Sequence, residues 1–491
     1  MKRVSEKLRA QATARTINPS LRGEDSRHRD RSNRQAIWAL ALLAGCSVFV
    51  ANAWADDANP PKPEATAAAP PTGDAAPPSI ADSLPALAPA ADFKKKLKDM
   101  GLNLQMTYIG EVLGNVSGGR QQGVIYDGRM EFLLEADMEK IANWQGGTMH
   151  VDSYWIQGTG LTRYYIGNLM DVSYIEALPT VRLYELWYEQ KLADNKLALR
   201  FGLLGADSDF VSSKYAQLFV NATTGWPEIF SGDMPSGGPA YPFSAMGFRA
   251  KYDATDSLSL VAAIYDGNPA GPGTNDPQRR NAYGLNFRLS DPALLMQEAQ
   301  YKYNQDKSST GLAGQVKVGA WEHLGGFPDM RYDANGRPFT LSGLPPAMLP
   351  GNYGVYAQID QQVFKAPDDP TKGVGVFARV FGSPDDRNLV DFYFDTGVNV
   401  SGLVRGRSDD VFGLSFAFTK ISNSVRGAAM DSGLQPLPNY EALLEATYQA
   451  QIVPGWSVQP VAQYIFHPYA QLNGTDYRNA AVFGIRTTVT Y

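Results

Sequence analysis

The last eleven residues of the chain alternate between apolar and polar side chains and end on an aromatic residue. In a strand over residues 481–491, Phe483, Ile485 and Tyr491 share one face, while Arg486 lies on the other face. A strand with one apolar and one polar face suits a wall between lipid and water. The pattern favours the closing strand of an outer-membrane β-barrel over its alternative, the edge strand of a soluble sandwich.

The composition narrows the choice of membrane architecture. The chain has 491 residues, of which 11% are aromatic and 19% charged, with 47 glycines and a mean hydropathy of −0.27. Past the N-terminal leader, no segment approaches eighteen uninterrupted apolar residues, so a helical membrane protein is excluded. A barrel is not excluded, because each of its strands carries only a weak hydropathy signal.

The N-terminus is predicted to be a secretory signal peptide over residues 1–55. A basic region precedes a short apolar stretch over residues 36–50, and Ala53 and Ala55 then form an A-x-A cleavage pattern. The alternative is lipidation at Cys46, the only cysteine, which ends a sequence resembling a lipoprotein box. Cleavage after Ala55 is the favoured interpretation, and neither outcome leaves a disulfide framework.

The composition changes twice after the leader. Residues 56–91 are rich in proline and alanine, which predicts a disordered linker. A short basic helix over residues 92–100 is then expected to open a barrel domain that occupies residues 92–491. The net charge is −6, and the leader carries ten basic and only four acidic residues, so the exported chain is more acidic still. This acidity argues against a nucleic-acid partner.

Alternating segments recur through the rest of the chain. A single-chain bacterial barrel has an even number of strands, joined by short periplasmic turns and longer outer loops. Placing residues 283–289 in an outer loop preserves this alternation and puts residues 324–350 in another outer loop. The predicted fold is an all-β, transmembrane antiparallel barrel of about sixteen strands, over residues 101–113, 123–138, 147–157, 180–191, 196–204, 244–252, 258–266, 294–304, 311–323, 351–363, 373–381, 389–404, 410–422, 439–452, 455–467 and 479–491.

The longest predicted connection is the third outer loop, over residues 205–243. A segment of this length without strong periodicity is usually functional or disordered. In a barrel of about sixteen strands, such a loop can fold inward and narrow the lumen. The alternative is that it caps the outside or contacts another subunit.

The sequence offers no motif for catalysis or for a cofactor. The four histidines are scattered, and the chain has no H-E-x-x-H, P-loop or G-x-S-x-G pattern. Acidic residues are plentiful, but nothing singles out the carboxylate pair of a glycoside hydrolase. We therefore expect neither an enzyme nor a metal or cofactor site.

Several segments spread over the predicted barrel carry a family resemblance: residues 183–190, 199–210, 221, 226–227, 241–249, 377–388 and 459–468. Together they resemble the carbohydrate-selective porins, the OprB-like family, and the resemblance covers residues 95–491. It implies a sixteen-stranded channel through which glucose and related sugars diffuse passively. It also implies an eyelet, or narrowest section, lined by charged and aromatic residues.

Strand alternation and the position of the long loop supply the eyelet candidates. Arginines and carboxylates can exchange hydrogen bonds with sugar hydroxyls, an aromatic face can cover a sugar ring, and the binding must stay weak for the solute to leave. The alternative for each charge is a solvated wall residue or an ion pair that braces the loop. The candidates are Arg129, Glu131, Glu135, Glu185, Trp187, Glu189, Arg200, Asp207, Asp209, Trp226, Arg249 and Arg379.

The expected function is a porin for monosaccharides in the Gram-negative outer membrane. Its expected partners are small sugars, outer-membrane lipid and the barrel-assembly machinery that handles the C-terminal strand, with the chain acting as a monomer or a homotrimer. The alternatives within transport are a general pore or one that prefers polyols or hydroxy acids. A plugged barrel with an enzymatic or structural role is the alternative outside transport.

Overall fold

The computed structural model describes residues 79–306, 308–367, 369–434, 438–469 and 477–491. The predicted signal peptide, with Ala53, Ala55 and Cys46, and most of the predicted linker lie outside the described residues. Among the residues that are described, no helix combines the length and the apolar character needed to cross a bilayer.

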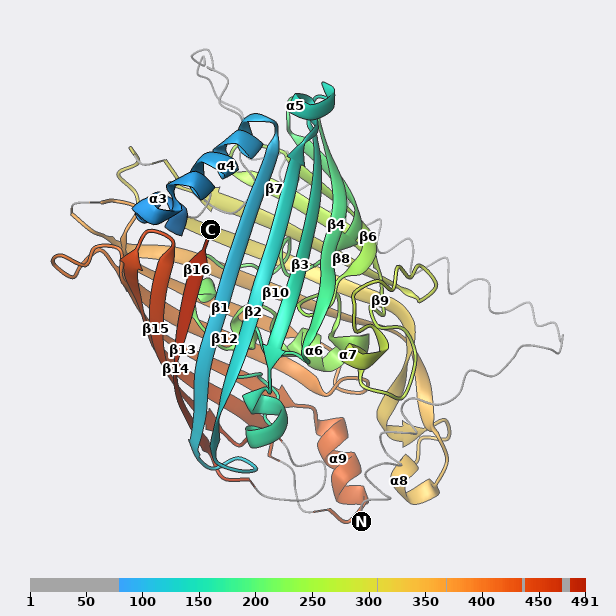
Figure 1. The fold of residues 1–491 in the computed structure, drawn as a ribbon. Helices are drawn as coiled ribbons and strands as arrows, with labels where there is room; N and C mark the ends of the chain where they lie inside the picture. Colours follow the sequence, from blue (N-terminus) through green and yellow to red (C-terminus); the bar gives the residue numbers. More distant parts are fainter. Residues whose placement is uncertain (1–78, 307, 368, 435–437, 470–476) are drawn as a thin grey trace. The chain divides into compact units, whose positions relative to one another are not determined.

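Sixteen antiparallel strands form one closed barrel, in which each strand pairs with its neighbours in sequence and β1 pairs with β16 (Figure 1). The predicted fold class is therefore confirmed. The strands are β1 (Leu102–Ser117), β2 (Gly123–Asp137), β3 (Gly147–Gly158), β4 (Thr180–Leu192), β5 (Leu197–Leu204), β6 (Ala245–Asp253), β7 (Leu258–Asp266), β8 (Ala293–Tyr303), β9 (Gly314–Asp333), β10 (Pro346–Lys365), β11 (Gly373–Gly382), β12 (Val390–Ser401), β13 (Val411–Ile421), β14 (Tyr440–Val453), β15 (Trp456–Phe466) and β16 (Ala480–Thr490).

The register assigns the side chains to two faces of the wall. Glu111 in β1 lies opposite both Arg486 in β16 and Asp127 in β2, and all three side chains are buried inside the barrel. The other face of the strands carries large apolar side chains that remain exposed, as expected for a surface in contact with lipid. This outer belt includes Phe132, Trp155, Phe201, Phe248, Val355, Phe412, Leu414, Phe483 and Ile485.

Two predicted boundaries in the outer loops meet different outcomes. Residues 283–289 form no strand, in agreement with their placement in a loop. The predicted loop over residues 324–350 is wrong in extent, because β9 continues to Asp333 and β10 already begins at Pro346. The two strands pair with each other there, with Leu349 opposite Phe327, so the hairpin supplies its own backbone hydrogen bonds. Glycines and prolines in this stretch obscured the alternation in the sequence.

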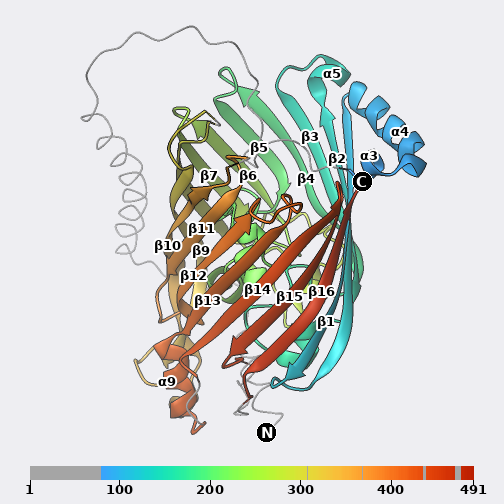
Figure 2. The same ribbon diagram turned by 90° about the vertical axis from the view of Figure 1, so that its left-hand side faces the viewer.

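The predicted linker ends earlier than residue 91. The helices α3 (Ile80–Ser83) and α4 (Ala88–Asp99) fill the residues just before β1, separated by a single short turn of helix. Prolines lie only at the first positions of these helical segments, where a missing N–H costs nothing. Ser83 Oγ donates to the Pro454 carbonyl at 2.7 Å, and Tyr491 donates to the Ala90 carbonyl at 2.8 Å. The N-terminal helices therefore dock beside the C-terminus, as Figure 2 shows.

Further short helices lie in the connections between strands. The turn between β2 and β3 holds α5 (Met138–Ala142), and the outer loops hold α6 (Glu228–Asp233), α7 (Pro277–Arg280), α8 (Phe339–Ser342) and α9 (Asn423–Asp431). Two outer loops position the functional site: L2 over residues 159–179 and L3 over residues 205–244. Apolar side chains from both loops are completely buried, although loops normally run over a protein surface.

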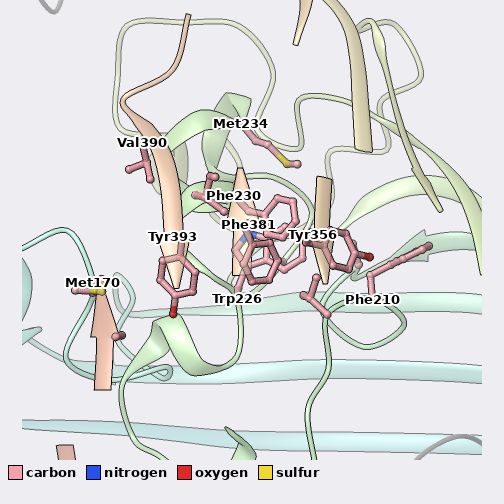
Figure 3. Close-up of a cluster of buried hydrophobic side chains, with 14 of the residues drawn as sticks. Met170, Phe210, Trp226, Phe230, Met234, Tyr356, Phe381, Val390 and Tyr393 are labelled. Atoms are coloured by element: carbon pink, nitrogen blue, oxygen red, sulfur yellow. The ribbon is translucent and has the colours of Figure 1, made fainter. Parts of the chain in front are cut away.

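L3 packs against one side of the barrel wall through an aromatic cluster (Figure 3). The Phe230 ring of L3 lies 5.6 Å from the Phe381 ring of β11 and 6.2 Å from the Tyr356 ring of β10. The Trp226 ring stacks on Phe230 at 4.5 Å. Burial of these large rings anchors L3 to strands β10–β12.

Candidate functional site

Carboxylates on the barrel wall hold the backbone of L3 inside the lumen. Glu445 in β14 accepts hydrogen bonds from the N–H groups of Val220 at 2.6 Å and Asn221 at 2.9 Å. Glu298 in β8 accepts a hydrogen bond from the Val211 N–H at 3.0 Å. A carboxyl group has two oxygens that accept hydrogen bonds, so one side chain can hold several backbone N–H groups and fix the loop to the wall.

L2 is held in the same way by Glu441, which accepts hydrogen bonds from the N–H groups of Leu169 and Met170 at 2.9–3.0 Å. Glu298, Glu441 and Glu445 were not among the predicted site residues. Alternation places Glu441 and Glu445 on the inner face of β14, but the sequence gives no sign that their partners belong to loops more than two hundred residues away.

Arg379, a predicted eyelet residue in β11, also braces L3. Its Nε donates to Asp395 at 2.9 Å, and its terminal nitrogens donate to the carbonyls of Val211 and Thr223, each at 3.1 Å. Its side chain is fully buried. Arg379 therefore fits the bracing role that the sequence left as an alternative, because its donors are occupied by protein groups.

Four of the predicted residues meet in one ion-pair network between L3 and the wall. Glu189 in β4 lies 3.0 Å from Arg200 in β5 and 2.9 Å from Arg249 in β6. Asp209 of L3 lies 3.3 Å and 3.1 Å from the same two guanidinium groups. The two arginines face each other in the strand register, so the two carboxylates screen a like-charge contact. We call Glu189, Arg200, Asp209 and Arg249 the charged quartet.

The quartet controls the ionisation of its loop carboxylate. Burial alone would raise the pKa of Asp209, but the guanidinium groups of Arg200 and Arg249 hold the pKa below its ordinary value. Asp209 is therefore ionised wherever the pore operates near neutral pH, and the ion pairs that tie L3 to β5 and β6 persist there.

Trp187 in β4 does not present a free ring face to the lumen. The His150 ring of β3 stacks on it with 4.4 Å between ring centres, and the Arg200 guanidinium carbon of β5 lies 3.9 Å from its ring centre. Because β3 and β5 flank β4, the two groups cover opposite faces of the indole. Its N–H donates to Glu185 at 3.1 Å. Trp187 therefore supports Arg200 rather than offering a surface on which a sugar ring can stack.

Arg129 and Glu131 in β2 form a more open pair. Their closest ion-pair distance is 3.5 Å, and their side chains are 11% and 19% exposed. The Arg129 guanidinium carbon lies 4.6 Å, 5.1 Å and 5.8 Å from the ring centres of Tyr154, Tyr241 and Tyr174. This pair combines accessible donors and acceptors with aromatic walls, which suits a hydroxylated solute.

Glu135 and Glu185 lie on either side of His150. The Glu135 carboxylate is 3.3 Å from His150 Nδ1, and the Glu185 carboxylate is 3.6 Å from its Nε2. Glu135 is the most exposed of the predicted carboxylates that form an ion pair, at 39% of its side chain. Glu185 also accepts a hydrogen bond from the Gly205 N–H at 2.7 Å, which fixes the start of L3.

The last two candidates, Asp207 and Trp226, act through hydrogen bonds rather than ion pairs. Asp207 accepts hydrogen bonds from the Tyr184 hydroxyl at 2.7 Å and the Tyr241 N–H at 3.2 Å, and so ties the two ends of L3 together. Trp226 lies in the aromatic cluster, where its indole N–H donates to the Gly237 carbonyl at 3.0 Å. Both residues shape the loop from within.

Comparisons with known proteins identify the family of the chain. Residues 121–491, most of the chain, match the family model described as "Carbohydrate-selective porin, OprB family". Porin B of Pseudomonas aeruginosa is 24% identical over 416 residues, which cover 80% of this chain and 88% of that protein. A protein of Acinetobacter baylyi named "Putative porin QuiX" is 21% identical over 403 residues, which cover 76% of this chain and 86% of that protein.

Solved structures extend the similarity to the fold. The high-pH structure of Pseudomonas putida OprB matches with a TM-score of 0.73 at 23% sequence identity, covering 82% of this chain and 97% of that one. The family match and the closed barrel together identify a transport channel of the outer membrane. The chain belongs to the carbohydrate-selective porin (OprB) family.

Proposed function

We propose that this porin lets monosaccharides such as glucose diffuse passively across the outer membrane, and that its selectivity arises at the charged section beside L3. The main support for the proposal is that nearly every charged side chain in this section pairs with a side chain of opposite charge. The charged quartet and the pair of Arg129 and Glu131 offer fixed donors and acceptors with little net charge. Such a surface replaces the water around neutral hydroxyl groups without attracting one ion strongly.

The same pairing keeps solute binding weak. Each guanidinium group of the quartet already donates to carboxylates, so a passing sugar gains only partial hydrogen bonds and leaves easily. The aromatic rings around Arg129 add an apolar surface for the C–H groups of a pyranose. Arg129, Glu131, Glu135 and Arg200 are the proposed solute contacts, whereas Arg379, Asp207 and Trp226 support the loop.

Swelling of liposomes that contain the mature protein tests the proposal with glucose, a polyol of similar size, a disaccharide and an anion of a hydroxy acid. We expect glucose to enter faster than its size alone predicts. The Arg129→Gln variant should lose this advantage, while Arg387→Gln should keep it, because Arg387 pairs with Asp386 in an outer loop. Equal entry of all small solutes would reduce the protein to a general pore, and no swelling would indicate a plugged barrel.

A further inference from the structure

Arg182 in β4 is a buried arginine without an anionic partner. Its exposed fraction is 2%, and it makes no hydrogen bond or ion pair with any residue that the structure describes. Arg249, Arg379 and Arg486 are equally buried, but each of them pairs with at least one carboxylate at 3.1 Å or less. A buried charge normally requires such a partner, so Arg182 is an exception that calls for an explanation.

The surroundings of Arg182 are aromatic rather than acidic. Its guanidinium carbon lies 4.9 Å from the centre of the Phe243 ring. The titratable groups nearest to it are the phenols of Tyr241, Tyr184 and Tyr154. Contact with aromatic rings offsets only a part of the cost of burying a cation. Among its three guanidinium nitrogens, only Nε is fully enclosed without a hydrogen-bond partner. The two terminal nitrogens are therefore the donors that a solute could reach.

Arg129 in β2 contacts the same tyrosines from the other side of β3. Tyr154 in β3 lies opposite Arg182 in β4 on one side and opposite Glu131 in β2 on the other side. Arg129 contacts the Tyr154 and Tyr241 rings, and its Nε is likewise enclosed and unpaired. Two arginines with unused donors therefore lie around one pair of tyrosines, with Glu131 as the single carboxylate that pairs with either of them among the described residues.

We infer that Arg182 and Arg129, with Tyr154, Tyr241 and Glu131, form a subsite for a small hydroxylated carboxylate anion, such as a sugar acid. The solute carboxylate would accept two parallel hydrogen bonds from the terminal nitrogens of Arg182. Its hydroxyl groups would bond to Arg129 and Glu131, and its C–H groups would lie against the tyrosine rings. This inference rests on the proposed function, since it adds a solute class to the same pore.

The position of Arg182 places this subsite between the outer loops and the charged quartet. β4 runs from Thr180 at the outer loop L2 to Leu192 at a short periplasmic turn. Arg182 thus precedes Glu185, Trp187 and Glu189 along the inner face and lies on the extracellular side of the charged quartet. A subsite there captures the anion before the narrow section and releases it toward the quartet.

Single-channel recording in planar bilayers tests the inference, with gluconate or glucose added on the side of the outer loops. We expect gluconate to reduce the ion current at lower concentrations than glucose does. Arg182→Gln should raise the half-blocking concentration of gluconate about tenfold, the ratio expected for the loss of one charge-assisted hydrogen bond. Arg182→Lys should give a smaller increase, because an ammonium keeps the charge but not the planar fork.

Lys251→Gln is the matched control, because Lys251 also faces the lumen and pairs with Asp253 at 3.5 Å, nearer the periplasmic end of β6. It should leave the gluconate block unchanged. An equal shift in Lys251→Gln and Arg182→Gln, or no shift in either, would overturn the subsite. If Arg182→Gln does not form a heat-stable barrel, Arg182→Lys decides, and an unchanged block in that variant would also overturn it. If the unaltered protein takes up glucose but gluconate does not block its current, only the subsite is refuted. If it takes up no glucose, the proposed pore is refuted.

Discussion

The guanidinium group of Arg200 lies over the ring of Trp187, with 3.9 Å between the guanidinium carbon and the ring centre. The contact joins β5 to β4 and holds Arg200 toward Glu189 and Asp209. An aromatic residue in the eyelet of a sugar channel suggests a stacking platform for the solute. In this chain the tryptophan instead positions the arginine.

Substitution of Trp187 separates these two roles. Trp187→Phe keeps a planar ring beneath Arg200, and we expect glucose uptake in the swelling assay to stay within about twofold of the original, since only one hydrogen bond of modest net strength is lost. Trp187→Ala removes the support and should raise the single-channel conductance and abolish the preference for glucose. A loss of preference in Trp187→Phe as large as that in Trp187→Ala would argue for direct stacking of sugar on the indole.

Glu189 shields the two arginines of the quartet from each other. In Glu189→Gln, the buried cations Arg200 and Arg249 keep only Asp209 as a carboxylate partner among the described residues. Removing one member of a buried ion pair costs about 3 kcal/mol or more. We expect a lower temperature for the heat-induced shift in gel mobility that marks barrel unfolding. Asp386→Asn breaks a more exposed pair with Arg387 and should leave that temperature unchanged.

Glu445 fixes the middle of L3 through two backbone N–H groups. Glu445→Gln replaces one of the two accepting oxygens with an NH₂ group, so the loop should move more on the microsecond-to-second scale. The expected readout is larger fluctuation of the open-channel current with little change in barrel stability. Glu139→Gln, in the exposed helix α5, should leave the current as steady as in the original chain. A steady current in Glu445→Gln would show that the aromatic cluster alone holds L3.

The lowered pKa of Asp209 sets the direction of a pH effect. A carboxyl whose pKa is depressed by folding contributes its stability above its unfolded pKa of about 3.9 and loses it as the pH falls through the lower, folded value. The part of the loop's steadiness that Asp209 supplies should therefore persist from neutral pH down to about pH 4 and be lost below it, measured as the difference in current fluctuation between the original chain and Asp209→Asn. Asp209→Asn should show larger fluctuation than the original chain at neutral pH, and disappearance of this difference near neutral pH would contradict the assignment.

The N-terminus of the mature protein remains a prediction of the sequence. Cleavage after Ala55 gives a chain that begins at Asp56, and N-terminal sequencing of protein extracted from the outer membrane would detect it. Ala55→Arg should block this cleavage and leave a longer precursor. A lipid-modified N-terminus at Cys46 would instead support the lipoprotein alternative.

The barrel could be predicted from the sequence because its pattern is local. Side chains alternate with a period of two in every strand, so Arg129, Glu189 and Arg486 could be assigned to the inner face one strand at a time. The requirement for an even number of strands then placed residues 283–289 in a loop. Where glycine and proline interrupt the alternation, as in the β9–β10 hairpin, the same reasoning ended β9 too early and began β10 too late.

The tertiary structure alone decided what each inward side chain does. The partners of Glu445 and Arg379 come from other strands or from loops, and no spacing in the sequence shows that Glu445 holds Val220. Nor does it show that Arg182 forms no ion pair with any residue that the structure describes. The sequence by itself determined which side chains of the barrel wall face lipid and which face the lumen, because this alternation depends only on neighbouring residues in each strand. The roles of the site residues depend on how L2 and L3 fold into the lumen, which burial of Phe230 and hydrogen bonds to distant wall carboxylates fix together.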